Sequence, residues 1–103
     1  MESNETCPGC RVYKATPRSE ETIKNLQLRL KRLNGQLAGI GKMLDDNRYC
    51  AEILTQIAAC ERALQEVGYI VLKEHLATCV SEDLKAGKEG VIDETLDLLK
   101  KLK

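Results

Sequence analysis

The sequence contains no Trp and no Phe, and its three aromatic residues are all Tyr, so little aromatic bulk is available for a core. Leu, Ile, Val and Ala must therefore supply the packing. A chain of 103 residues suits one domain. A domain this small buries a modest share of its surface, so oligomerisation is a natural way to complete its core. No strand pattern and no internal repeat is visible, and we expect an all-α protein.

Long apolar runs are also missing. None approaches the roughly 20 residues that a membrane-spanning helix needs, and the polar start of the chain does not resemble a signal peptide. We therefore expect a cytoplasmic protein with no membrane partner. Thiols stay reduced in that compartment, and an odd number of cysteines, five, indicates metal binding or reactivity more than structural disulfides.

Net charge is absent as well, because 16 acidic residues balance 16 basic ones. The balance is not local: positions 24–44 carry five basic residues and no acidic residue. A basic stripe of this kind can meet phosphate, so the neutral total does not exclude a nucleic-acid partner. Lys and Arg on a helix most often simply face solvent, and composition alone favours that simpler interpretation.

The N-terminal half predicts a tail followed by a helix. Residues 1–16 lack apolar periodicity and are expected to be flexible, and Thr16-Pro17 suits a helix start. Residues 17–103 then form a single helical domain. The first helix carries apolar residues in an a/d pattern, which predicts a buried stripe between helices packed lengthwise. The stripe consists of Leu26, Leu30, Leu33, Leu37, Ile40 and Leu44.

Three glycines interrupt this first helix. Gly35, Gly39 and Gly41 each cost roughly 1 kcal/mol relative to Ala inside a helix. Their clustering indicates either that another molecule or segment approaches the helix closely, or that the helix is weak or kinked.

Two further helices are expected. Asp45-Asp46-Asn47 breaks the first pattern and can cap a second helix, which is predicted from about Arg48 to Val80. Such a helix has roughly 30 residues and is about 45 Å long. Residues 85–90 predict a turn, and a short third helix follows it, with Val91, Leu99 and Leu102 on its apolar side.

The one histidine, His75, precedes Cys79 by four residues, so on a helix both side chains lie on the same face and can hold one metal ion. A lone His beside a buried Cys is more often packing than ligation. Cys50 lies on the same stripe but 25 residues earlier, roughly 37 Å away along a helix. One ion can reach all three residues only if two copies of the helix pack antiparallel, with Leu64 near the twofold axis.

The donor set predicts the metal. Two thiolates and one imidazole are soft ligands that select Cu(I) over hard ions. Zn²⁺ prefers a fourth donor, and Ni²⁺ or Co²⁺ would favour more nitrogen, which a chain with one His does not offer.

The residues also resemble a known family. Cys50, His75 and Cys79 in a helical chain of this length resemble the copper-sensitive operon repressor family, whose members also sense nickel, cobalt, formaldehyde or persulfide. The resemblance covers about residues 19–103 and is carried by four segments: Arg29–Ile40, Asn47–Cys50, Glu74–Val80 and Ile92–Glu94.

This resemblance implies a three-helix protomer that forms an antiparallel four-helix-bundle dimer and then a dimer of dimers, a homotetramer. It implies a non-enzymatic, metal-sensing and DNA-binding repressor that binds operator DNA in the apo form. Cu(I) binding to Cys50 of one subunit and to His75 and Cys79 of its partner would release the DNA and derepress copper-resistance genes. Tyr49 and Glu94 match positions that couple the metal to DNA release. A copper chaperone is a further candidate partner.

Neither a helix-turn-helix nor a zinc-finger signature is present, so DNA contact is assigned to exposed residues of the helical domain. The assigned residues are Lys24, Arg29, Lys31, Arg32, Gln36, Lys42 and Arg48. Binding through these charges would depend strongly on salt.

Alternatives remain. The same fold could sense persulfide or thiol oxidation through Cys50 and Cys79, a role that needs no imidazole. Cys7 and Cys10 could be a redox pair, half of a second metal site or idle auxiliary thiols, and a thiol oxidoreductase would lack its usual βαβ context. Cys60 is expected to be a small buried apolar residue. A helical scaffold or copper store would bind no DNA.

Overall fold

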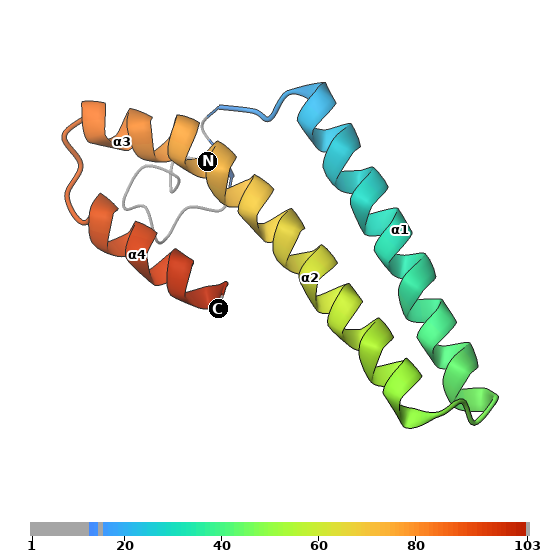
Figure 1. Ribbon diagram of the computed structural model, residues 1–103. Helices are drawn as coiled ribbons and strands as arrows, with labels where there is room; N and C mark the ends of the chain where they lie inside the picture. Colours follow the sequence, from blue (N-terminus) through green and yellow to red (C-terminus); the bar gives the residue numbers. More distant parts are fainter. Residues whose placement is uncertain (1–12, 15, 103) are drawn as a thin grey trace. The chain divides into compact units, whose positions relative to one another are not determined.

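The computed structural model describes residues 13, 14 and 16–102, and these residues form helices and turns without a strand (Figure 1). The helices are α1 (Glu20–Asp45), α2 (Cys50–His75), a π-helical turn η3 (Leu76–Val80), α3 (Ser81–Lys85) and α4 (Val91–Lys101). The predicted all-α class is confirmed. None of these helices is long and apolar enough to cross a lipid bilayer.

The chain divides into two compact units. We call residues 19–68 the hairpin unit; it contains α1 and the first part of α2. We call residues 1–18 together with 69–103 the terminal unit; it contains the end of α2, η3, α3 and α4. Each unit is described by itself below.

Helix α1 begins later than the sequence predicted. Ser19, not Thr16-Pro17, is its N-cap, because the Ser19 hydroxyl accepts a hydrogen bond of 3.1 Å from the backbone N–H of Thr22. Glu20 and Glu21 in the first turn suit the positive end of the helix dipole.

The end of α1 also differs from the prediction. Asn47 has a left-handed φ of 55°, and the N–H groups of Asn47 and Arg48 donate to the carbonyls of Leu44 and Met43. This bonding pattern closes a helix C-terminus, and Asn tolerates the left-handed conformation it needs. Asn47 therefore ends α1 rather than capping α2, and the short connection returns the chain so that α2 runs antiparallel to α1 (Figure 1).

The predicted apolar stripe of α1 is only half buried in one chain. Leu26 and Leu33 are buried, whereas Leu30, Leu37 and Leu44 are exposed, Leu44 to 59%. These three residues are exposed in one chain because a single neighbouring helix covers only one side of α1, and burial of the whole stripe stays a prediction. Cys60 of α2 is buried, which confirms its predicted packing role.

The terminal unit is built around the π-turn. Helix α4 packs against η3, and Cys79, Val80 and Val91 are buried. The second helix is therefore not one uniform α-helix to Val80, as the sequence predicted, because its last turn is π-helical. The predicted turn after Lys85 is confirmed: Gly87 and Gly90 adopt left-handed conformations with φ of 77° and 79°.

The glycines of α1 meet nothing in the isolated chain: a side chain built at Gly35, Gly39 or Gly41 has no neighbouring segment within 4 Å. Gly35→Ala should therefore raise the free energy of unfolding by about 1 kcal/mol, since Ala is the better helix former. Urea denaturation measures this change.

The matched control is Gly90→Ala, which should destabilise the protein because its φ of 79° is unfavourable for a side chain. A loss of stability in Gly35→Ala would show instead that another subunit packs on this position.

Candidate metal centre

The three predicted ligands lie at the two ends of α2. Cys50 is its first residue and is exposed, and it belongs to the hairpin unit. His75 is the last residue of α2 and is half-buried. Cys79 lies one turn further, in η3, and only 3% of its surface is exposed.

His75 has the features of a ligand awaiting a partner. Its Nε2 atom is buried and has no hydrogen-bond partner among the residues that the structure describes. A buried polar atom without a partner is costly, and native proteins rarely keep one without a function. Nε2 of a neutral imidazole is a common metal ligand. The residue therefore fits a metal site.

The Cys79 sulfur has polar neighbours. The Thr78 hydroxyl lies 3.6 Å from it and also donates to the Glu74 carbonyl at 2.9 Å. The Lys14 ammonium donates to the same sulfur at 3.2 Å and to the Thr78 hydroxyl at 3.1 Å. Because the Thr78 hydroxyl has one proton and donates it to the Glu74 carbonyl, Lys14 is the donor that contacts the Cys79 sulfur most directly.

One chain does not bring the three ligands together. Helix α2 is unbroken from Cys50 to His75, and its rise per residue separates its ends by about 37 Å. Within residues 13, 14 and 16–102 of a single chain, no three His, Cys, Asp or Glu side chains lie close enough to hold one ion. His75 and Cys79 could supply two ligands of a site that is completed by another chain, and we call this pair the half-site.

The other predicted residues are placed as follows. Tyr49 directly precedes α2, accepts hydrogen bonds from Glu52 and Ile53 through its carbonyl, and is 73% exposed. Glu94 lies half-buried in the first turn of α4. Cys7 and Cys10 lie outside the described residues.

The residues assigned to DNA are all exposed. Lys24, Arg29, Lys31, Arg32, Gln36 and Lys42 follow α1, and Arg48 lies in the connection after it. Arg48 forms an ion pair of 2.6 Å with Glu52, which neutralises part of its charge. Arg29 donates to Asn25 at 3.1 Å, which fixes its guanidinium along the helix.

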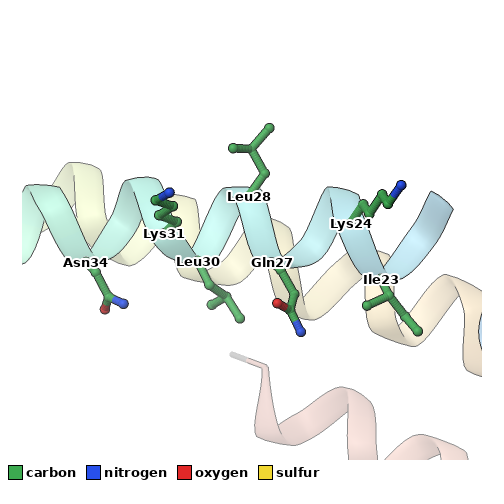
Figure 2. Close-up of a pocket in the computed structure, with 7 residues that line it drawn as sticks. All are labelled: Ile23, Lys24, Gln27, Leu28, Leu30, Lys31 and Asn34. Carbon is green, nitrogen blue, oxygen red and sulfur yellow. The ribbon is translucent and has the colours of Figure 1, made fainter. Parts of the chain in front are cut away.

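A shallow groove runs along the first half of α1 and includes Lys24 and Lys31 in its lining. Figure 2 shows Lys24, Leu28 and Lys31 on one side of the helix, and Ile23, Gln27, Leu30 and Asn34 on the other. Side chains that diverge in this way do not enclose a small ligand. Both sides of the helix carry polar and apolar side chains here, and the two lysines lie together on one of them (Figure 2).

Residues 22–101 match the family described as metal-sensitive transcriptional repressor. The chain belongs to this family. The predicted membership is confirmed, and the family is one of repressors rather than enzymes.

Named relatives of this repressor sense metals. The copper-sensing transcriptional repressor CsoR of Bacillus subtilis (strain 168) is 43% identical over 74 residues, which are 71% of this chain and 73% of the relative. The crystal structure of the copper-sensing repressor CsoR with Cu(I) from Geobacillus thermodenitrificans NG80-2 has a TM-score of 0.78 and 42% identity, covering 85% of this chain and 93% of that one. The nickel-responsive transcriptional regulator InrS has a TM-score of 0.70 and 30% identity, covering 85% and 100%.

The sequence did not reveal one group at the repressor's half-site. Lys14 is 65 residues from Cys79, and no helical periodicity relates positions so far apart. Only the folded chain places the Lys14 ammonium group on the sulfur.

His75→Leu should not lower the free energy of unfolding of the metal-free repressor, because the buried Nε2 has no hydrogen bond to lose. The control is Thr95→Val: the buried Thr95 hydroxyl donates to the Val91 carbonyl at 2.8 Å. Its loss should cost about 1 kcal/mol.

Chemical denaturation in the presence of a chelator measures the free energy of unfolding of both variants. A large loss of stability in His75→Leu would indicate that His75 serves the fold and not a metal.

Proposed function

We propose that this repressor binds operator DNA in the absence of metal and releases it when Cu(I) binds between two subunits. Cys50 of one subunit and His75 and Cys79 of the other would hold the ion. The observation that carries this proposal is the half-site at the end of α2, where a buried Nε2 without a partner lies one turn from a buried thiol. The third soft donor lies at the opposite end of the same helix.

An uncovered apolar face supports the dimer. Leu30 and Leu37 of α1 are 41% and 51% exposed, and Ile57 and Leu64 of α2 are 39% and 54% exposed. Leu30, Leu37 and Leu64 each follow a buried residue of the same helix by four positions. Because α1 and α2 are antiparallel, the same offset places these side chains on one side of the hairpin unit (Figure 1).

That apolar face fits a second copy of the hairpin unit. Two hairpins packed on this face make an antiparallel four-helix bundle, the arrangement that the sequence predicted. In a symmetric pair the midpoint between Cys50 and the half-site falls near Leu64, which is exposed on this face. Each Cys50 would then meet the half-site of the other chain, giving two identical sites. Two such dimers would form the tetramer.

The donors favour Cu(I) over nickel. Two sulfurs and one nitrogen make a soft, three-coordinate set, which suits Cu(I). Nickel favours sites with more nitrogen ligands. The chain has one His, so each proposed site contains one imidazole and two sulfurs. The copper-sensing relatives are also more similar to this chain than the nickel-responsive one.

The DNA-binding face is assigned to α1. Five basic residues and no acidic residue occupy positions 24–44, and all five are exposed. Symmetry multiplies this basic face in an oligomer, so several phosphates can be neutralised at once.

A protein that regulates transcription acts where the DNA is, so a cytoplasmic location is part of the proposal. The copper chaperone stays a prediction.

Metal and DNA are coupled through the assembly. Cu(I) bridges two subunits and therefore stabilises the arrangement in which Cys50 meets the half-site. If the basic faces do not match the duplex in that arrangement, metal and DNA weaken each other by the same factor.

A persulfide or thiol-redox sensor is the rival function. It would join Cys50 and Cys79 directly and would leave His75 without a role. Cys50 is exposed, but Cys79 is 3% exposed and therefore a poor target for a reagent in solution. Titration with Cu(I) and with a persulfide donor, each followed by DNA release, separates the two functions.

The shared site can be tested with mixed dimers. Cys50→Ala and Cys79→Ala should each abolish three-ligand binding as homodimers, because every site loses one sulfur. A mixed dimer of the two variants keeps one complete site and should recover tight binding of one Cu(I) per dimer.

Competition with a Cu(I) chelator, on mixed dimers purified through two affinity tags, measures this recovery. Cys60→Ala is the control, since Cys60 is buried away from the proposed ligands and should leave Cu(I) affinity unchanged. Failure of the mixed dimer to bind would rule out the shared site.

Arg32→Ala should weaken binding to an operator duplex selected from random DNA by at least about 10-fold. The slope of the logarithm of the binding constant against the logarithm of the salt concentration should become shallower by about 0.9 for each phosphate that is no longer neutralised. Cu(I) affinity should not change. Lys100→Ala, an exposed cation in the last turn of α4, is the control.

Fluorescence anisotropy at several salt concentrations gives both quantities. Equal DNA affinity for wild type and Arg32→Ala would refute the assignment of this face.

A further inference from the structure

Three described residues that precede α1 contact the stretch of chain that carries the half-site, all inside the terminal unit. Lys14 donates to Cys79 and Thr78 at 3.2 and 3.1 Å. The Thr16 hydroxyl donates to the Glu82 carboxylate. Arg18 pairs with Glu74, with 2.7 Å between Nε and Oε1. We call Lys14, Thr16 and Arg18 the clasp.

The clasp brackets the two ligands of the terminal unit. Glu74 directly precedes His75, and Glu82 follows Cys79 by three residues, so the outer two contacts hold the chain on both sides of the half-site. The central contact is on the ligand sulfur itself. The Arg18–Glu74 pair is partly sheltered, because 36% and 16% of the two side chains are exposed, so solvent weakens it less than a surface pair.

An ammonium on the sulfur opposes a metal ion on the same sulfur. Lys14 and Cu(I) both carry positive charge, and both take electron density from Cys79. While Lys14 donates to this sulfur, its ammonium group occupies the side of the sulfur and the electron pair that a metal ion would use. Only 3% of Cys79 is exposed, so little room is left for a metal ion beside the ammonium group.

We propose that the clasp covers Cys79 in the metal-free repressor, and that Cu(I) binding displaces Lys14 and releases the segment that carries Lys14, Thr16 and Arg18. This inference rests on the proposed Cu(I) site. Closure of the clasp and occupation of the site are then mutually exclusive. By reciprocity, the clasp weakens Cu(I) binding by the factor by which Cu(I) opens the clasp. It therefore sets the concentration of Cu(I) at which DNA is released.

Lys14→Gln tests the central contact. Removing the competing cation should tighten Cu(I) binding by about 10-fold, the size expected for one charge-assisted hydrogen bond in a partly buried place. Chelator competition on the full chain measures this change at one fixed pH. Lys85→Gln, an exposed cation of the same unit at the end of α3, should leave the affinity unchanged.

Arg18→Gln tests the clasp as a unit. It removes the ion pair with Glu74 but leaves Lys14 in place, so it should tighten Cu(I) binding by a smaller factor than Lys14→Gln. Hydrogen–deuterium exchange of the peptide spanning the clasp should rise when Cu(I) is added to wild type. In Lys14→Gln the exchange should already be fast without metal.

The outcomes separate the two proposals. Cu(I) affinity in Lys14→Gln that is equal to wild type or weaker overturns the clasp, and so does a clasp peptide that stays protected with Cu(I) bound. A wild-type protein that binds no Cu(I) overturns the proposed function itself. His75→Leu, which should bind Cu(I) poorly, must show no metal-induced rise in exchange if the opening depends on the site.

Discussion

The length of α2 is the constraint on which the proposed metal response depends. An α-helix rises 1.5 Å per residue, so an unbroken helix from Cys50 to His75 holds its two end ligands about 37 Å apart. No adjustment of side chains closes that distance. A three-ligand site can form only where the start of one α2 meets the end of another. In the proposed site, metal binding therefore requires subunit assembly.

The hairpin unit of a single chain leaves part of its apolar surface exposed. Leu26, Leu33 and Cys60 are buried within the chain, but Leu30 and Leu64 remain exposed beside them. A second hairpin that covers these residues contributes the burial that a chain with three aromatic residues cannot supply alone. The apolar contact between two hairpin units would therefore place Cys50 of one chain opposite the half-site of the other. A small change in that contact would alter both the dimer and the metal site.

At the half-site, burial and charge act together. The Nε2 atom of His75 is buried without a hydrogen-bond partner, so an ion or donor that bound it would remove an energetic cost. Cys79, in contrast, is already engaged by Lys14 and Thr78. The π-turn that carries Cys79 is an irregular backbone of the kind that recurs at functional sites. In the proposed site His75 would be open to the metal, whereas Cys79 would first have to be freed from Lys14, and this difference would give the metal response a threshold.

Local sequence patterns determined much of this protein. Apolar periodicity gave the helices, Gly87 and Gly90 marked the last turn, and the spacing of His75 and Cys79 indicated a shared helix face. These features depend on neighbours within a few residues. The tertiary structure alone decided that Leu30 stays exposed in one chain while Leu33 is buried, and that Lys14 lies on the sulfur of Cys79. Each of these follows from packing between residues far apart in the chain, which no periodicity encodes.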